Sequence, residues 1–143
     1  MIAYFDTSAF LKLVIDEPGS GEVVELWLTA EHVLSSILLY PEGRAALAMA
    51  RRLGRLSPAA SGAARTEFEA LFADLALIAA TDDLLRRAGD LAETHALRGY
   101  DAVHLASIEA VGDSETVMVT ADHHLHTAAL DRGLAAANLP TSA

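Results

Sequence analysis

The sequence contains no cysteine and only one lysine, Lys12. Without cysteine, the chain can form neither a disulfide framework nor a thiolate zinc site. It also lacks a long hydrophobic run, since the longest, around Leu75 to Ala80, is too short to span a bilayer. The chain begins with the apolar segment MIAYF rather than a basic segment and a cleavage site, so we expect no signal peptide. These absences predict a soluble, cytoplasmic protein that does not bind membranes.

Basic residues are also scarce, because 20 acidic residues outnumber 10 lysines and arginines and give a net charge of −10. This balance argues against a general nucleic-acid-binding surface. Residues 43–65 nevertheless contain no acid and five arginines, here called the arginine strip: Arg44, Arg51, Arg52, Arg55 and Arg65. The strip could guide a phosphate backbone toward an active site, or it could be a solvated helix face or contact a partner protein. The sequence leaves both interpretations open.

Short apolar runs alternate with amphipathic segments along the chain. Its 143 residues, 52% of them hydrophobic, predict a single domain over residues 1–143. We expect strands at residues 2–5, 33–38, 75–79 and 116–120, and a short edge strand after residue 135. We expect helices at about residues 7–15, 22–31, 41–56, 64–73, 82–92, 101–111 and 122–133, with a break at residues 57–62. The alternation predicts a three-layer α/β/α domain with a mostly parallel central sheet of four to five strands.

Four acidic residues each lie where a predicted strand gives way to a helix: Asp6, Glu42, Asp101 and Asp122. A doubly wound strand order, 3-2-1-4-5, would place the first and fourth strands side by side. Asp6 and Asp122 would then face each other across the point where the strand order reverses. Because clustered carboxylates repel one another, such a site needs a cation, and Mg²⁺ prefers oxygen ligands. The pattern predicts a metal-dependent phosphodiesterase.

Each acid also has a purely structural interpretation. Asp6 and Asp122 could be helix N-caps, and Glu42 could be a first-turn acid that interacts with the helix dipole. Asp101 is harder to explain in this way, because it begins a helix that is otherwise almost entirely apolar. Asp101, His104 and Ser107 follow one another at three-residue intervals and form one polar line. Such a line needs polar partners, or a cavity with water or metal.

Four segments together carry a family resemblance: YFDTSAFLKL, LLYPEGRAALA, LRGYDAVHLA and VMVTADHHL. Over essentially its whole length the chain resembles the PIN-domain ribonucleases, and most closely the VapC toxins of bacterial VapBC toxin–antitoxin pairs. The resemblance implies a Mg²⁺- or Mn²⁺-dependent endoribonuclease that hydrolyses single-stranded or loop RNA. It also implies a homodimer that is held inactive by a VapB-type antitoxin, an arginine or similar cation of which enters the acidic pocket.

Position by position, the resemblance places the family's acidic quartet on the four acids named above, as catalytic residues and metal ligands. A supporting hydroxyl would come from Thr7, Ser8 or Thr120, and the polar line adds His104 as a supporting residue. Gly43 departs from the family pattern, where a larger apolar residue is more common. We expect this glycine to loosen the helical turn that carries Glu42.

Other functions fit the sequence less well. A haloacid-dehalogenase phosphatase would need a second aspartate two residues after Asp6, and a receiver domain would need a lysine after a late strand. A zinc hydrolase could use His123, His124 and His126, but only the first and last share a helical face, and solvent-facing histidines are favoured. His123 and His124 also stand where relatives carry other polar residues, which leaves the number of metal ions open. A non-toxin RNA-processing nuclease remains an alternative, whereas a catalytically silent RNA- or protein-binding module would have no use for four clustered acids.

Overall fold

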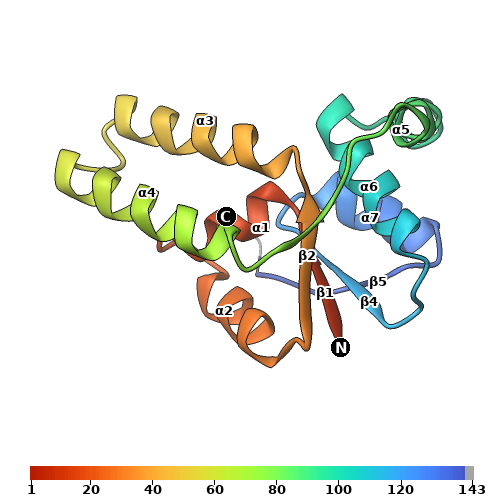
Figure 1. The fold of residues 1–143 in the computed structure, drawn as a ribbon, viewed down its shortest axis with the longest axis horizontal. Helices are drawn as coiled ribbons and strands as arrows, with labels where there is room; N and C mark the ends of the chain where they lie inside the picture. Colours follow the sequence, from red (N-terminus) through yellow and green to blue (C-terminus); the bar gives the residue numbers. More distant parts are fainter. Residues whose placement is uncertain (141–143) are drawn as a thin grey trace.

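A computed structural model describes residues 1–140, which contain five strands and seven helices (Figure 1). Residues 141–143, the end of the predicted single domain, lie outside the described part. The elements follow in the order β1 (Ile2–Phe5), α1 (Thr7–Leu11), α2 (Ser20–Thr29), β2 (His32–Ser36), α3 (Leu39–Arg52), α4 (Pro58–Phe72), β3 (Ala76–Ile78), α5 (Asp82–His95), α6 (Gly99–Val111), β4 (Thr116–Val119), α7 (His123–Asp131) and β5 (Ala135–Ala136).

The five strands described within residues 1–140 form one parallel sheet in the order β3-β2-β1-β4-β5. Ile2 at the start of β1 is in register with His32 of β2 on one side and with Thr116 of β4 on the other. The predicted strand order is therefore confirmed. Because all strands run the same way, their carboxyl ends meet at one edge, and the order reverses between β1 and β4.

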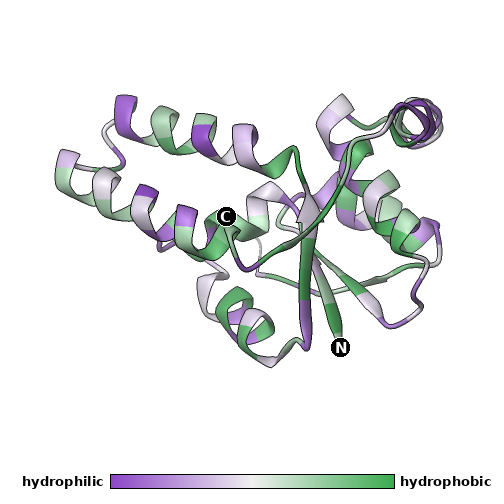
Figure 2. Ribbon diagram, in the orientation of Figure 1, coloured by the Kyte–Doolittle hydropathy of each residue, from purple (hydrophilic) through white to green (hydrophobic). Residues whose placement is uncertain are grey.

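Side chains of the central strands alternate between the two faces of the sheet, as the pleat requires. Ala3 and Phe5 of β1 and Val119 of β4 pack against α1 to α4 on one face. Tyr4 and Met118, their neighbours along the strands, pack against α5, α6 and α7 on the other. The predicted three-layer α/β/α architecture is thus confirmed. Figure 2 shows that β1 is largely hydrophobic, whereas α5 at the periphery is mostly hydrophilic.

The helices α3 and α4 lie side by side and project away from the sheet (Figure 1). The predicted break between them is wrong in part, because α4 begins at Pro58 rather than at residue 64. Ser57 caps this helix by accepting a hydrogen bond from the backbone N–H of Ala60, and proline suits its first position because no N–H is needed there. The first helix is also shorter than predicted and ends at Leu11.

Gly43 of α3 lies directly against a side chain of α4. A Cβ atom built on Gly43 would lie only 2.3 Å from Cε2 of Phe68, which is fully buried in α4. The glycine thus has a packing role that the sequence did not indicate, because it lets the Phe68 ring pack directly against the α3 backbone. None of the helices in the described part of the chain is both long and apolar enough to cross a bilayer.

Candidate active site

Asp6 follows β1 directly and has both a capping and a site-facing oxygen. Its Oδ1 accepts a hydrogen bond from the backbone N–H of Ala9, 2.9 Å away, and so caps α1. Its Oδ2 accepts a 2.6 Å hydrogen bond from the Thr120 hydroxyl. The Ser8 hydroxyl lies 2.8 and 2.9 Å from the two oxygens. The carboxylate is therefore fixed by three donor groups, including two of the three hydroxyls predicted to support the site.

Burial raises the pKa of Asp6 above the usual carboxyl range. A protonated His104 would oppose this shift most strongly, followed by the hydrogen bonds from Thr120, Ala9 and Ser8. Burial dominates, so the metal-free site disfavours the charged form of Asp6. A nearby divalent cation would reverse this preference, because an opposite charge favours the ionised carboxylate.

Asp122 follows β4 and repeats the arrangement seen at Asp6. Its Oδ1 accepts a 2.9 Å hydrogen bond from the backbone N–H of Leu125 and caps α7, while its Oδ2 faces the site. The backbone N–H of Asp122 donates to the Thr120 hydroxyl, which in turn donates to Asp6. Thr120 thus links the two aspartates across the point where the strand order reverses. Asp6 and Asp122 can therefore act both as helix caps and as site residues, since one oxygen of each carboxylate caps a helix and the other is left for the site.

Glu42 lies in the first turn of α3 and is held by two side chains from other elements. The Thr7 hydroxyl donates to its Oε1 at 2.9 Å, and Nε2 of His104 lies 3.0 Å from the same oxygen. The second ring nitrogen of His104, Nδ1, lies 2.8 Å from the hydroxyl of Tyr4. His104 therefore links Tyr4 in the hydrophobic core to Glu42 in the acidic site.

The neighbours of His104 select one tautomer of its ring. Burial raises the pKa of Tyr4, and its protonated hydroxyl can donate to Nδ1 of a neutral ring. Nε2 then carries the ring proton and donates to Glu42. The predicted polar line of α6 is thus satisfied by protein groups at His104, and Ser107 donates locally to the Val103 carbonyl.

Asp101 lies in the first turn of α6, which begins at Gly99 rather than at Asp101 itself. Its Oδ2 accepts a 3.0 Å hydrogen bond from Nε of Arg98, and Nη2 of the same guanidinium lies 3.3 Å from Oδ2 of Asp122. The hydrogen bond to Asp101 is the main reason that the pKa of Arg98 is raised, and the negative charges of Asp101, Asp122 and Glu42 add to the effect. One guanidinium therefore bridges two of the four acids and lies in the field of a third.

Arg98 is not among the site residues predicted from the sequence. A signal was present, because an arginine three residues before an aspartate can form an ion pair on one helix face. The bridge to Asp122 had no such signal. Arg98, Asp101 and Asp122 line a cavity of about 390 Å³ together with Ala96, Leu97 and His124. His124 thus lies beside the acids, and its ring is close to that of His123, with 6.0 Å between the centroids.

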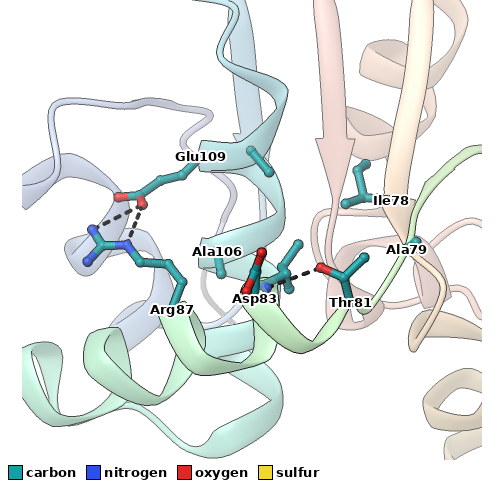
Figure 3. Close-up of a pocket in the computed structure, with 9 residues that line it drawn as sticks. Ile78, Ala79, Thr81, Asp83, Arg87, Ala106 and Glu109 are labelled. Carbon is teal, nitrogen blue, oxygen red and sulfur yellow. Dashed lines mark hydrogen bonds and ion pairs between the residues drawn. The ribbon is translucent and has the colours of Figure 1, made fainter.

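A larger cavity, of about 570 Å³, lies elsewhere, where the end of β3 meets α5 and α6 (Figure 3). Figure 3 shows Arg87 of α5 and Glu109 of α6 joined by an ion pair in this cavity. Glu109 also accepts a 2.7 Å hydrogen bond from Arg132, so this acid is already neutralised by two arginines. None of the four predicted acids lines this cavity, and we therefore place the candidate active site at the carboxyl edge of the sheet.

The four acids supply the donor set that a hard divalent ion prefers, namely carboxylate oxygens flanked by hydroxyl groups. Within residues 1–140, no three histidine or acidic side chains are arranged as a ready-made metal site. Asp101 and Asp122 instead point at Arg98, whose guanidinium supplies the positive charge between them. The residues therefore fit a divalent ion, provided that this guanidinium moves away when the ion binds.

The arginine strip is partly assembled into a groove of about 340 Å³ between α3 and α4. The groove is lined by Arg44, Leu47, Ala48, Arg51, Arg52, Ser61 and Arg65, and none of these described residues is acidic. Arg44 is the most restrained of the arginines, since it donates to the Tyr40 hydroxyl at 2.7 Å and to Glu69 at 3.2 Å. Arg55 lies beyond the end of α3 and is exposed.

The groove faces away from the acids. Arg51 follows Glu42 by nine residues, which is about 2.5 helical turns and ~14 Å along the α3 axis. The two side chains therefore project from opposite sides of α3. A phosphate backbone bound in the groove would have to pass around α3 to reach the acids, so a direct path along one face of the helix is excluded.

Comparison with known proteins identifies the family. A family model described as the PIN domain matches residues 3–130. The chain belongs to the PIN domain family. It is 45% identical over 128 residues to Ribonuclease VapC45 of Mycobacterium tuberculosis, which covers 90% of this chain and 89% of that protein. The resemblance to VapC proteins seen in the four sequence segments is thereby confirmed.

Solved PIN-fold structures agree in architecture at much lower identity. PAE2754 from Pyrobaculum aerophilum superposes with a TM-score of 0.72 at 21% identity, covering 95% of this chain and 83% of that one. VapBC2 from Rickettsia felis, solved bound to a DNA fragment from its promoter, gives a TM-score of 0.68 at 14% identity and covers 98% of this chain and 100% of that one. These likenesses support the fold alone.

Proposed function

We propose that this PIN domain protein is a Mg²⁺- or Mn²⁺-dependent endoribonuclease that hydrolyses single-stranded or loop RNA as the toxin of a toxin–antitoxin pair. The observation that carries the proposal is the gathering of acids around one cation at the carboxyl edge of the sheet. Asp101 and Asp122 share the Arg98 guanidinium, and Asp6 is joined to Asp122 through Thr120. The 45% identity to a protein named as a VapC ribonuclease supports the choice of RNA.

In this proposal Asp6, Asp101 and Asp122 would hold the metal, directly or through water. When bound, a divalent ion lowers the pKa of a water molecule and neutralises charge on the phosphate. Glu42 would orient the attacking water, and the contacts from Thr7 and His104 leave its second oxygen, Oε2, for this task. Hydrolysis would leave a 5′ phosphate and a 3′ hydroxyl. Since this chemistry does not use the ribose 2′ hydroxyl, the preference for RNA has to come from binding.

A VapB-type antitoxin is the proposed partner, and VapBC2, a structural neighbour of the chain, is named as such a pair. Met49 and Leu53 support this partner, because both are exposed. Met49 lies on the Glu42 side of α3, seven residues along the helix, and Leu53 is the C-cap that follows its last turn. An antitoxin segment could cover these apolar side chains and direct a positive charge toward the acids, as Arg98 does within the chain. We also propose a homodimer, as the family resemblance implies, and a cytoplasmic location.

A cleavage assay with matched variants tests the proposal. Purified protein is incubated with labelled single-stranded RNA in Mg²⁺, Mn²⁺ or EDTA, and Asp122→Asn is compared with Asp131→Asn, an exposed aspartate at the other end of α7. We expect cleavage only with a divalent ion, loss of cleavage in Asp122→Asn and unchanged cleavage in Asp131→Asn. Equal activity of the two variants would refute the assigned site. Growth arrest on expression, relieved by a co-expressed upstream antitoxin, separates a toxin from an RNA-processing nuclease.

A further inference from the structure

Arg98 is held by the acidic site but is not buried in it. Its side chain is 80% exposed, whereas those of Asp101 and Asp122 are 14% and 22% exposed. The residue precedes α6, and its guanidinium extends along the surface to reach Oδ2 of both aspartates. The charge of Glu42 acts on it as well. One exposed guanidinium therefore contacts two of the four acids and lies in the electrostatic field of a third.

An exposed ion pair of this kind is weak. Pairs between solvent-exposed charges contribute little, because water screens them and a long side chain has to be ordered. A divalent ion carries twice the charge and binds carboxylate oxygens directly, so it can replace the guanidinium between Asp101 and Asp122. Arg98 can leave without disturbing the fold, because its side chain is largely exposed and makes no capping hydrogen bond to α6.

We propose that Arg98 is a displaceable counter-ion of the active site that neutralises Asp101 and Asp122 until a divalent metal replaces it and then binds the phosphate backbone of the RNA. This inference rests on the proposed metal-dependent function. The second step follows from the first, because the displaced guanidinium stays tethered beside the site at the start of α6. The RNA phosphate is the new anion that arrives there, and a guanidinium can bind two of its oxygens at once.

Metal binding can be measured without RNA and without catalysis. Mn²⁺ is titrated into the wild type and into Arg98→Gln, Arg98→Lys and Arg86→Gln by calorimetry. Arg86 is a matched control on α5, since it is 77% exposed and pairs with Asp82 at 2.9 Å. We expect Arg98→Gln to bind Mn²⁺ about two- to tenfold more tightly than the wild type, because two weak competing pairs are gone. Arg98→Lys should lie between them, since lysine keeps the charge but not the planar fork.

The same substitution should weaken RNA binding, whereas it should strengthen Mn²⁺ binding. At saturating Mn²⁺, Arg98→Gln should raise the KM for single-stranded RNA with little change in kcat. The slope of log(kcat/KM) against log salt should become shallower by about 0.7, the value for one phosphate contact on a single strand. Arg86→Gln should match the wild type in both experiments.

The outcomes separate this inference from the function on which it rests. Mn²⁺ binding to Arg98→Gln that is no tighter than to the wild type, with RNA cleavage intact, would overturn the counter-ion role alone. Tighter Mn²⁺ binding with an unchanged salt slope would overturn the phosphate contact. Absence of Mn²⁺ binding in both the wild type and the variant would overturn the metal-dependent function, and the counter-ion role with it.

Discussion

Replacing Tyr4 with phenylalanine should destabilise the fold although it removes a single oxygen atom. The Tyr4 hydroxyl lies 2.8 Å from Nδ1 of His104, and both residues are buried. Without the hydroxyl, Nδ1 becomes a buried acceptor that has lost its donor, which costs about 1–3 kcal/mol of folding free energy. For a domain of this length such a loss lowers Tm by roughly 2–10 °C.

A double-mutant cycle attributes this loss to the contact itself. In a His104→Leu background the tyrosine hydroxyl has already lost its partner, so Tyr4→Phe should then be nearly neutral. Urea unfolding of the four proteins gives the coupling energy, which we expect to be about 1–3 kcal/mol. If Tyr4→Phe costs the same free energy in both backgrounds, the hydroxyl does not hold His104, and the reasoning about the tautomer at Glu42 fails.

Three further predictions concern packing, pH and the basic groove. Gly43→Ala should lower stability in urea unfolding by about 1–3 kcal/mol, because its Cβ would collide with the buried ring of Phe68, and a more stable variant would contradict this packing. Because burial raises the pKa of Asp6, its protonated form contributes stability that is complete below the ordinary carboxyl pKa and is lost as the pH rises through the raised value. In metal-free thermal melts, Asp6→Asn should not lose stability over this pH range. If its stability falls with pH as much as that of the wild type, Asp6 does not cause the loss. Joint replacement of Arg51 and Arg52 by alanine should weaken RNA or antitoxin binding with Mn²⁺ affinity unchanged, and for RNA should make the salt slope shallower by about 1.4. Unchanged binding of both partners would leave the groove as a solvated surface.

The placement of the acids could be predicted because it depends on topology rather than on exact element boundaries. Strands that alternate with helices form a parallel sheet, and all their carboxyl ends then share one edge. Asp6 and Asp122 follow neighbouring strands, so the sequence alone was enough to bring them together. The start of α4 was misplaced because Ser57 and Pro58 are typical both of a turn and of a helix beginning.

The contacts that complete the site were beyond sequence reasoning because they join distant residues. Tyr4 and His104 are 100 residues apart, and Arg98 and Asp122 are 24 apart. Neither pair follows a helical or strand period, so no local pattern indicates it. The role of Gly43 likewise depends on Phe68 of the next helix, and from the sequence alone the glycine could only be taken as a weak helix former.

Metal-dependent RNA cleavage by the wild type and by Asp101→Asn tests the central claim most directly. Both proteins are assayed on single-stranded RNA with Mg²⁺ and with EDTA, and thermal melts of the same preparations show how much of each is folded. We expect the wild type to cleave only with Mg²⁺ and to leave 5′ phosphates. Asp101→Asn should be inactive, and its metal-free form should be no less stable than the wild type, because one of the clustered like charges is gone. Full Mg²⁺-dependent cleavage by Asp101→Asn, or cleavage by the wild type in EDTA, would contradict a metal site built on these acids.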